Sequence, residues 1–241
     1  MKATIHRFLQ RLGYDIHRFH AAAYPEAQLA RELRSRSFDL VLDVGANAGQ
    51  FGRKLRDNGY TGRIVSFEPL QEPRTRLLAE AARDGKWEVA ERAAIGDRDG
   101  EIEIHVSANS YSSSVLEVLD THLRTAPESR YVGSERMPLR RLDAIAGGYL
   151  RPESVTVLKI DTQGFEDKVL DGAAGILPRI AGIQLELSVV PLYAGQALLP
   201  EMLDHLRNLD FTMWGAWPAL VEPDSGRLLQ LDAIFFRSTG G

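Results

Sequence analysis

Short apolar runs that alternate with helical stretches constrain the fold of this chain more than any other feature. The first run covers residues 38–43, and a helical stretch through Leu55 follows it after a glycine-rich turn. Such runs are typical of buried strands in a parallel sheet, whose strands are joined by right-handed helical crossovers. The pattern predicts further strands at 63–67, 87–90, 101–106, 155–160, 182–187, 211–214 and 228–236, and helices at 71–83, 164–177 and 197–209.

The length and the charge distribution divide the chain into a main domain and a basic N-terminal segment. The chain has 241 residues, which suits one α/β domain, and we place that domain at residues 37–241. Residues 1–36 carry seven Lys and Arg against three Asp and Glu. Apolar side chains at helical spacing over residues 4–20 predict an amphipathic helix there. This helix either packs on the domain or contacts an anionic membrane or a lipid-linked substrate.

Several classes of protein are disfavoured by composition. The net charge of −4 argues against a nucleic-acid partner, since such proteins usually carry a basic surface. The absence of cysteine excludes disulfides, thiolate metal sites and cysteine nucleophiles. Neither a membrane-spanning stretch nor a signal peptide is visible. We expect a cytoplasmic protein, peripheral to the inner face of the membrane if residues 1–36 bind lipid. Composition does not indicate its oligomeric state.

Two predicted strands end in sequences that suit a nucleoside ligand. The first ends in Asp43-Val-Gly-Ala-Asn-Ala-Gly49, whose glycines let the backbone approach a ligand at a helix N-terminus. The second ends in Phe67-Glu68-Pro69, and a carboxylate there can accept hydrogen bonds from both ribose hydroxyls. Ligands of such sheets bind beyond the carboxyl ends of the strands. The loop and the acid together predict an adenosine-containing cofactor. The alternatives are that the loop is only a tight strand-to-helix turn and that Glu68 is a solvated surface acid.

The loop residues also indicate which cofactor binds. A dinucleotide fingerprint has a second glycine two positions after Gly45, where this chain has Asn47. An acid, Asp43, stands at the entrance of the loop, where it would repel a phosphate. A phosphate-free cofactor with a cationic amino-acid end fits this arrangement better, and S-adenosylmethionine is such a molecule.

Five segments resemble the successive motifs of the FkbM family of methyltransferases. They are Asp43-Val-Gly-Ala-Asn-Ala-Gly49, Phe67-Glu-Pro69, Ala93-Ala-Ile-Gly-Asp97, Arg141-Leu-Asp143 and Leu158-Lys-Ile-Asp-Thr-Gln-Gly-Phe-Glu166. The resemblance runs from about residue 38 to the last strand. It implies the class I, Rossmann-like fold: a mostly parallel seven-stranded sheet with helices on both faces. It also implies O-methylation of a sugar or a polyketide-like natural product.

The resemblance assigns cofactor contacts position by position. It implies that Glu68 binds the ribose and that Asp161 lies beside both the sulfonium and the acceptor. It implies that the first loop binds the methionine portion and that the third motif lies along the adenine. The predicted cofactor-binding residues are therefore Asp43, Gly45, Ala46, Asn47, Gly49, Glu68, Pro69, Ala93, Ala94 and Asp161. The chain departs from the family pattern twice. It has Glu91-Arg92 where an Asn is usual, and Gln163 where a Glu is usual.

A hydroxyl acceptor needs a general base or a Lewis-acidic metal, because an alcohol is a poor nucleophile until it loses its proton. Asp161 follows one predicted strand and Glu186 lies near the end of the next. The two carboxylates either flank the acceptor oxygen or share a Mg²⁺ with the substrate, although no recognised metal motif is present. His122, in the polar segment 107–135, is an alternative base because imidazole titrates near neutrality. We expect that segment to be a flexible insert above the ligand-binding edge.

Three functions compete at this point. The first is an S-adenosylmethionine-dependent O-methyltransferase that acts on a sugar hydroxyl, on a glycolipid or another glycosylated natural product. The second is an NAD(P)-dependent oxidoreductase on a similar sheet, which the missing glycine and the lack of a clear Tyr-x-x-x-Lys motif oppose. The third is a nucleoside-binding module that has lost turnover, which the intact acids at both strand ends oppose.

Overall fold

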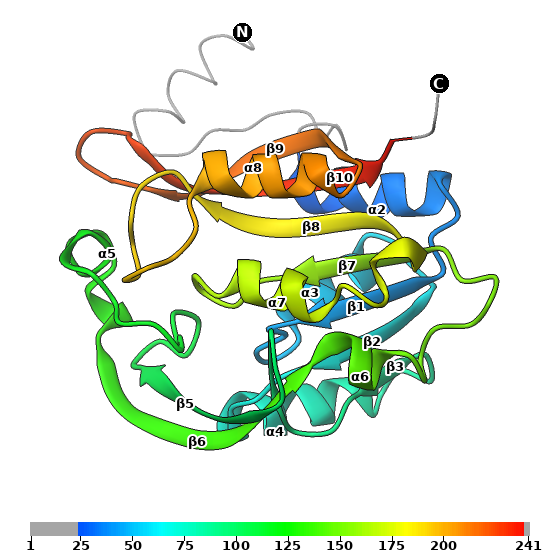
Figure 1. Ribbon diagram of the computed structural model, residues 1–241, viewed down its shortest axis with the longest axis horizontal. Coiled ribbons are helices and arrows are strands. Elements are labelled where there is room, and N and C mark those ends of the chain that lie inside the picture. Colours follow the sequence, from blue (N-terminus) through cyan, green and yellow to red (C-terminus); the bar gives the residue numbers. More distant parts are fainter. Residues whose placement is uncertain (1–23, 239–241) are drawn as a thin grey trace, which may run out of the picture.

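The computed structural model describes residues 24–238, and its centre is a seven-stranded sheet, which Figure 1 shows. The strand order is β3-β2-β1-β7-β8-β10-β9. The first five strands in this order run parallel, whereas β10 is antiparallel to both β8 and β9. The strands are β3 (Trp87–Val89), β2 (Arg63–Phe67), β1 (Leu40–Val44), β7 (Thr156–Ile160), β8 (Ile180–Ser188), β10 (Leu228–Arg237) and β9 (Phe211–Val221). The predicted mostly parallel seven-stranded sheet is confirmed.

Helices cover both faces of this sheet. Figure 1 shows α7 and α8 in front of the sheet and α2 and α3 behind it. The front helices are α6 (Leu142–Ala146), α7 (Glu166–Gly172) and α8 (Leu199–Asn208), and the rear helices are α2 (Pro25–Ser35), α3 (Gln50–Asp57) and α4 (Gln71–Ala81). The predicted helix at 164–177 divides into α7 and a 3₁₀ turn at Leu177–Arg179.

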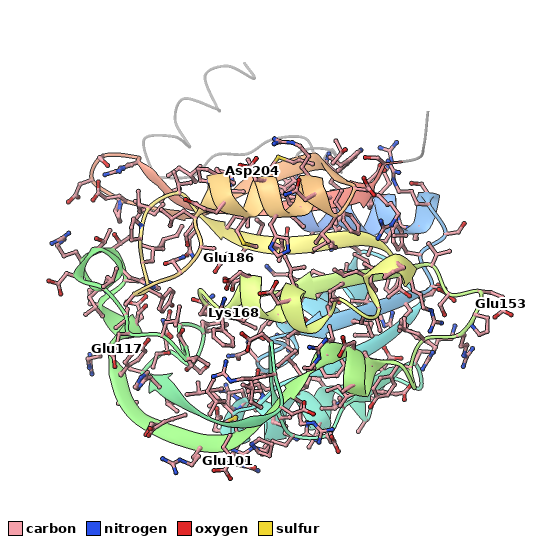
Figure 2. The ribbon with its side chains drawn as sticks, viewed as in Figure 1. Glu101, Glu117, Glu153, Lys168, Glu186 and Asp204 are labelled. Carbon is pink, nitrogen blue, oxygen red and sulfur yellow. The ribbon has the colours of Figure 1, made fainter. Side chains whose placement is uncertain are left out.

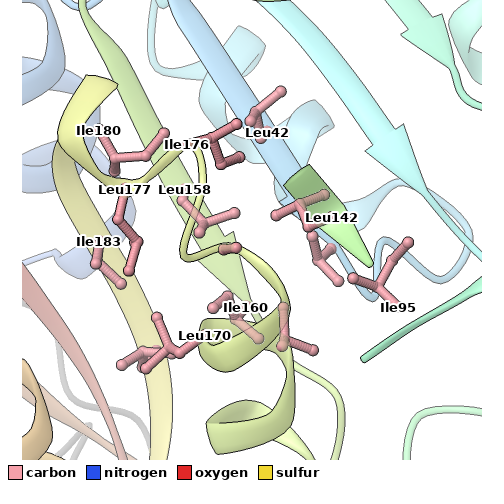
Figure 3. Packing of buried hydrophobic residues seen from close by; sticks show 14 of the residues in the cluster. Leu42, Ile95, Leu142, Leu158, Ile160, Leu170, Ile176, Leu177, Ile180 and Ile183 are labelled. Carbon is pink, nitrogen blue, oxygen red and sulfur yellow. The ribbon is translucent and has the colours of Figure 1, made fainter. Parts of the chain in front are cut away.

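Alternate side chains of each central strand enter two separate cores. On the front face, Leu158 and Ile160 of β7 pack with Leu170 of α7 and Ile183 of β8 (Figure 3). On the rear face, Val157 belongs to a second cluster with residues of α2 and α3. Burial of apolar area on both faces stabilises the sheet by roughly 25 cal/mol per Å². The short apolar runs of the sequence therefore reflect strands that are covered on two sides.

A second, three-stranded sheet stands beside the first, and Figure 1 shows its long strands curving away from the main sheet. Its order is β4-β6-β5, with β4 (Ala94–Gly96), β6 (Tyr131–Arg141) and β5 (Gly100–Ser107). The strand expected at 101–106 is β5. The segment expected to be a flexible insert at 107–135 contains α5 (Asp120–Thr125), a 3₁₀ turn at Pro127–Ser129 and the start of β6.

The N-terminal segment is described only from residue 24 onward. Helix α2 packs on the rear face of the sheet, where Leu29 and Leu33 join the same core cluster as Phe38 and Phe236. The amphipathic helix expected over residues 4–20, and the membrane contact proposed for it, lie outside the described residues and stay predictions. Within residues 24–238, the longest helices are too short and too polar to cross a bilayer.

Candidate active site

The loop after β1 passes unusually close to the end of β7. Gly45 and Ala46 both donate their backbone N–H groups to the carbonyl of Phe67, which holds the loop against β2. Gly45 has a φ of +75°, and a Cβ atom there would lie 1.8 Å from the carbonyl oxygen of Asp161. Only glycine therefore fits this position. Gly49, also in the left-handed region, packs against Trp87 and Leu77 instead, and it does not line the cavity described below.

A charged row crosses the rear face of the sheet beneath this loop. Asp43 of β1 is fully buried and accepts a hydrogen bond from the hydroxyl of Ser66 on β2 at 3.1 Å. On the other side, the ammonium of Lys159 on β7 lies 3.1 Å from Oδ1 of Asp43 and donates to the carbonyl of Gly45 at 2.9 Å. Burial alone would lower the pKa of Lys159, but Asp43 and Asp161 raise it above its ordinary value. Asp43 thus anchors Lys159 under the loop, and its side chain does not reach the cavity wall.

Glu68 follows β2 and faces the loop. Its Oε2 accepts the backbone N–H of Asn47 and its Oε1 accepts that of Leu70, both at 2.8 Å. The side chain is buried, and burial raises its pKa to about 7, although these two hydrogen bonds act in the opposite direction. Each carboxylate oxygen keeps further acceptor capacity toward the cavity.

Asp161 and Glu186 are brought together at the ends of β7 and β8, as the sequence predicted. The side-chain amide of Gln163 donates to Oδ1 of Asp161 and to Oε2 of Glu186, at 2.8 Å in each case. Gln163 is itself held by the hydroxyl of Tyr193, which donates to its Oε1 at 2.7 Å. An amide suits this bridge, because an ionised carboxylate at position 163 would repel both acids.

The environment of Glu186 makes it a stronger proton acceptor than an ordinary glutamate. Burial raises the pKa of Glu186 well above its ordinary value, and the neighbouring carboxylates of Asp161 and Asp232 raise it further. Its Oε2 accepts hydrogen bonds from Gln163 and Gln230, whereas its Oε1 accepts none from residues 24–238. One oxygen is thus held in place and the other is available to a ligand. Figure 2 shows Glu186 on β8, facing the interior of the molecule.

Glu166, in the same motif as Asp161, has a structural role. Its carboxylate accepts the backbone N–H groups of Thr162 and Gly164, at 2.8 Å to Oε1 and 3.0 Å to Oε2 respectively. The side chain is buried, and burial raises its pKa to about 7. Glu166 therefore closes the turn between β7 and α7.

The serine-rich loop between β5 and α5 covers the cofactor loop. Asn47 donates its side-chain amide to the carbonyl of Ser110 at 3.0 Å, and Gln50 donates to the hydroxyl of Tyr111 at 3.2 Å. His122 lies behind this loop. Its ring is buried, hydrogen-bonds to Ser129 at 3.2 Å and is not among the residues that line the cavity. Burial lowers its pKa below the ordinary value.

A cavity of about 360 Å³ lies at the carboxyl ends of the central strands. Of the predicted site residues it is lined by Gly45, Ala46, Asn47, Glu68, Pro69, Ala94, Asp161 and Glu186, whereas Asp43, Gly49, Ala93 and His122 lie outside its wall. The cavity is also lined by Lys159, Gln163, Gln184, Trp217 and Asp232. Of these five residues, only Gln163 was named in the sequence analysis above, as a departure from the family pattern. Among residues 24–238 no group of three or more His, Asp or Glu could hold a metal ion, so Mg²⁺ gains no support.

Comparison with known proteins identifies the family. The model of the methyltransferase FkbM domain matches residues 43–213. The chain is 28% identical over 194 residues to the 2-O-methyltransferase NoeI of Sinorhizobium fredii, and the match covers 77% of each protein. It is also 33% identical over 186 residues to the AMB antimetabolite synthetase AmbE of Pseudomonas aeruginosa, where it spans 61% of this chain and only 8% of that much longer protein. The chain belongs to the FkbM family and is an S-adenosylmethionine-dependent methyltransferase of the class I fold.

Two of the solved structures that match this chain are named as methyltransferases. One is the 1,6-didemethyltoxoflavin-N1-methyltransferase of Burkholderia thailandensis with bound S-adenosylhomocysteine, at a TM-score of 0.47 and 14% identity, which covers 91% of this chain and 79% of that one. Another is an S-adenosylmethionine-dependent methyltransferase from Mesorhizobium loti, at a TM-score of 0.48 and 10% identity, which covers 90% of this chain and all of that one.

Proposed function

We propose that this protein transfers the methyl group of S-adenosylmethionine to a hydroxyl oxygen of a sugar. The observation that carries this proposal is the paired acid site, in which Glu186 is oriented through Oε2 while its Oε1 faces the cavity unpartnered by residues 24–238. Such a group suits removal of a hydroxyl proton. The similarity to a protein named as a 2-O-methyltransferase supports an oxygen acceptor.

The charge of the cavity fits this cofactor. Its wall carries five acids and two lysines: Glu26, Glu68, Asp161, Glu186 and Asp232, with Lys54 and Lys159. A pyrophosphate would be repelled here, whereas a sulfonium is favoured, which disfavours a nicotinamide dinucleotide and the oxidoreductase alternative. In this proposal Glu68 holds the ribose, Pro69 and Ala94 lie along the adenine, and Asp161 stands nearest the sulfonium. When bound, the cofactor supplies the methyl electrophile.

The residues of the chain activate and position the acceptor. Gln163 and Gln230 fix the carboxylate of Glu186, so that its free oxygen can accept the proton of the acceptor hydroxyl. Gln163 holds Asp161 in the same network, which keeps the two acids from separating. The loop that carries Ser110 and Tyr111 closes over the cofactor loop and helps exclude water.

Replacing Glu68 with alanine is expected to weaken binding of S-adenosylhomocysteine by about tenfold to a hundredfold, because hydrogen bonds to a charged acceptor are lost. Isothermal titration calorimetry measures this directly. Glu201→Ala, at an exposed position on α8, is the matched control. Unchanged affinity in Glu68→Ala would refute the ribose assignment.

In the same titrations NADH is expected not to bind, and tight NADH binding would favour the oxidoreductase. Methyl transfer from labelled S-adenosylmethionine to a panel of glycosides tests activity and would exclude a module without turnover.

The affinity for S-adenosylhomocysteine is also expected to depend on pH. The ionised form of Glu68 is the one that accepts from ribose hydroxyls while keeping its two backbone hydrogen bonds. Because burial raises the pKa of Glu68 to about 7, the dissociation constant should increase by about tenfold per pH unit below that value. Calorimetry across the acidic range measures the slope. In Glu68→Gln the slope should disappear, and a slope that persists in this variant would assign the titration to another group.

A further inference from the structure

Three cavity residues beyond the paired acid site share one face of the sheet. Gln184 of β8 stands beside Lys159 of β7 in the strand register, and Asp232 of β10 stands directly opposite Glu186. Trp217 of β9 pairs with Asp232 from the other side. All of them line the part of the cavity that is bordered by α2 and α3. Neither the cofactor contacts nor the proton transfer proposed above uses Gln184, Asp232 or Trp217.

The polar groups of Gln184 and Asp232 have no partners within residues 24–238. Gln184 is only 9% exposed, and its Oε1 is buried without a hydrogen bond. Leaving such an acceptor unpaired costs about 1–3 kcal/mol. The carboxylate of Asp232 likewise makes no hydrogen bond or ion pair with the described residues. Burial raises its pKa to about 6, so it is ionised near neutral pH. A ligand that donates hydrogen bonds would satisfy both groups.

The charges that surround Asp232 are unbalanced. Glu186 lies opposite it, and directly opposed like charges destabilise a strand pair. Asp161 also raises the pKa of Asp232, while Lys159 lowers it but is engaged with Asp43. The other two charged residues that act on Asp232, Lys54 and Glu26, form an ion pair with each other, at 2.7 Å between Nζ and Oε1. A cation between Asp232 and Gln184 would restore the balance.

The indole of Trp217 completes the surroundings of these two groups. Its Nε1 donates to the side chain of Gln28 on α2 at 3.2 Å, which fixes the ring. The absence of a side chain at Gly215 leaves room for the ring, since a Cβ there would lie 3.3 Å from it. Tryptophan is the aromatic side chain that attracts ammonium groups best. A carboxylate, an amide carbonyl and an indole are together a recognition set for a protonated amine.

We propose that Gln184, Asp232 and Trp217 form a subsite for a protonated amine on the acceptor, which makes the substrate an amino sugar. This inference rests on the proposed function only for the identification of the acceptor as a sugar. A phosphorylated or carboxylated sugar would be repelled by the acids of the cavity. A neutral sugar would leave the charge of Asp232 desolvated and unpaired.

Binding of simple glycosides tests the subsite without requiring methyl transfer. Methyl aminodeoxyglucosides, with the amine on each ring carbon in turn, are compared with methyl glucoside by ligand-observed NMR on the full chain, with and without S-adenosylhomocysteine. At least one amine is expected to bind about tenfold more tightly than methyl glucoside near neutral pH. Asp232→Asn should reduce this preference to about onefold to twofold while leaving the binding of methyl glucoside unchanged.

Two further variants separate the subsite from general damage. Gln184→Leu should also reduce the preference for the amine, whereas Asp224→Asn, in the exposed turn between β9 and β10, should retain it in full. Equal binding of amines and methyl glucoside by the wild type, or a preference that survives both Asp232→Asn and Gln184→Leu, would overturn the inference. Affinity for S-adenosylhomocysteine is measured in the same samples. If the wild type does not bind S-adenosylhomocysteine, the proposed function is contradicted, but the comparison of amines with methyl glucoside remains valid.

Discussion

Replacing Glu186 with glutamine is expected to lower kcat by about 10²–10⁴-fold, because the acceptor hydroxyl then has no group to receive its proton. Glutamine keeps the shape of glutamate and removes a repulsion from Asp161 and Asp232. The variant should therefore fold at least as stably as the wild type and bind S-adenosylhomocysteine with nearly the same affinity. Single-turnover methyl transfer from labelled S-adenosylmethionine measures the chemical step.

The pH profile gives this variant a second readout. The general base must be deprotonated, so the rate should fall as the pH decreases through the pKa of Glu186, which burial raises well above the ordinary value. The acidic limb of the wild-type profile should therefore lie well above the range of an ordinary glutamate, and it should vanish in Glu186→Gln.

A distant carboxylate provides the control. Glu153 is exposed and lies at the right-hand edge of the molecule in Figure 2, well away from Glu186. Glu153→Gln should retain wild-type kcat and the wild-type pH profile. If Glu186→Gln also keeps kcat within about threefold of the wild-type value, another group accepts the proton of the acceptor hydroxyl. Asp161→Asn is then the next variant to measure.

The central sheet could be predicted from the sequence because its strands are buried on both faces. Strands such as β1 and β7 consist of five consecutive buried residues, which the sequence shows as short, predominantly apolar runs. One strand of the small sheet, β6, gives no such signal. β6 contains Pro138 and several arginines, and most of its residues are exposed or half-buried. Its pairing with β5 depends on residues far away in the sequence, so composition indicated only a polar insert.

The site could be predicted in part, for a similar reason. Acids at strand ends are recognisable in a sequence, and Glu68, Asp161 and Glu186 do line one cavity. Strand register decides the rest. Asp43 stands beside Lys159 on the neighbouring strand, so its carboxylate forms an internal ion pair and does not contact the cavity. The sequence gives no means of pairing those two residues, because 116 positions separate them.

The role of His122 shows the same limit of local sequence information. A histidine in a segment of serines and asparagines is typical of an exposed, polar loop. The fold instead places its ring under the loop, in edge-to-face contact with Tyr193 at 5.1 Å between ring centroids. Tyr193 in turn holds Gln163, so this part of the chain supports the acid pair from behind. Burial, which only the tertiary structure reveals, separates this histidine from the cavity.

Replacing Lys159 with methionine is expected to lower the free energy of unfolding by about 3–5 kcal/mol, because one partner of a buried ion pair is removed. Asp43 is 0% exposed, and without Lys159 its charge has only the hydroxyl of Ser66 to stabilise it. The loop would also lose the hydrogen bond from Lys159 to the carbonyl of Gly45. Urea denaturation followed by circular dichroism measures the change, provided that the m-value stays constant.

Two comparisons test this explanation. Lys54 forms its ion pair with Glu26 at the surface, where its side chain is 57% exposed, so Lys54→Met should cost only about 0–1 kcal/mol. The double variant Lys159→Met with Asp43→Asn removes both buried charges and should regain much of the stability that the single variant loses. If Lys159→Met costs no more than Lys54→Met, or if the double variant is as unstable as Lys159→Met alone, the unpaired carboxylate of Asp43 is not the cause. The row of charges under the cofactor loop would then serve to position Gly45 and Asp161 rather than to stabilise the fold, and the defect should appear in cofactor affinity instead.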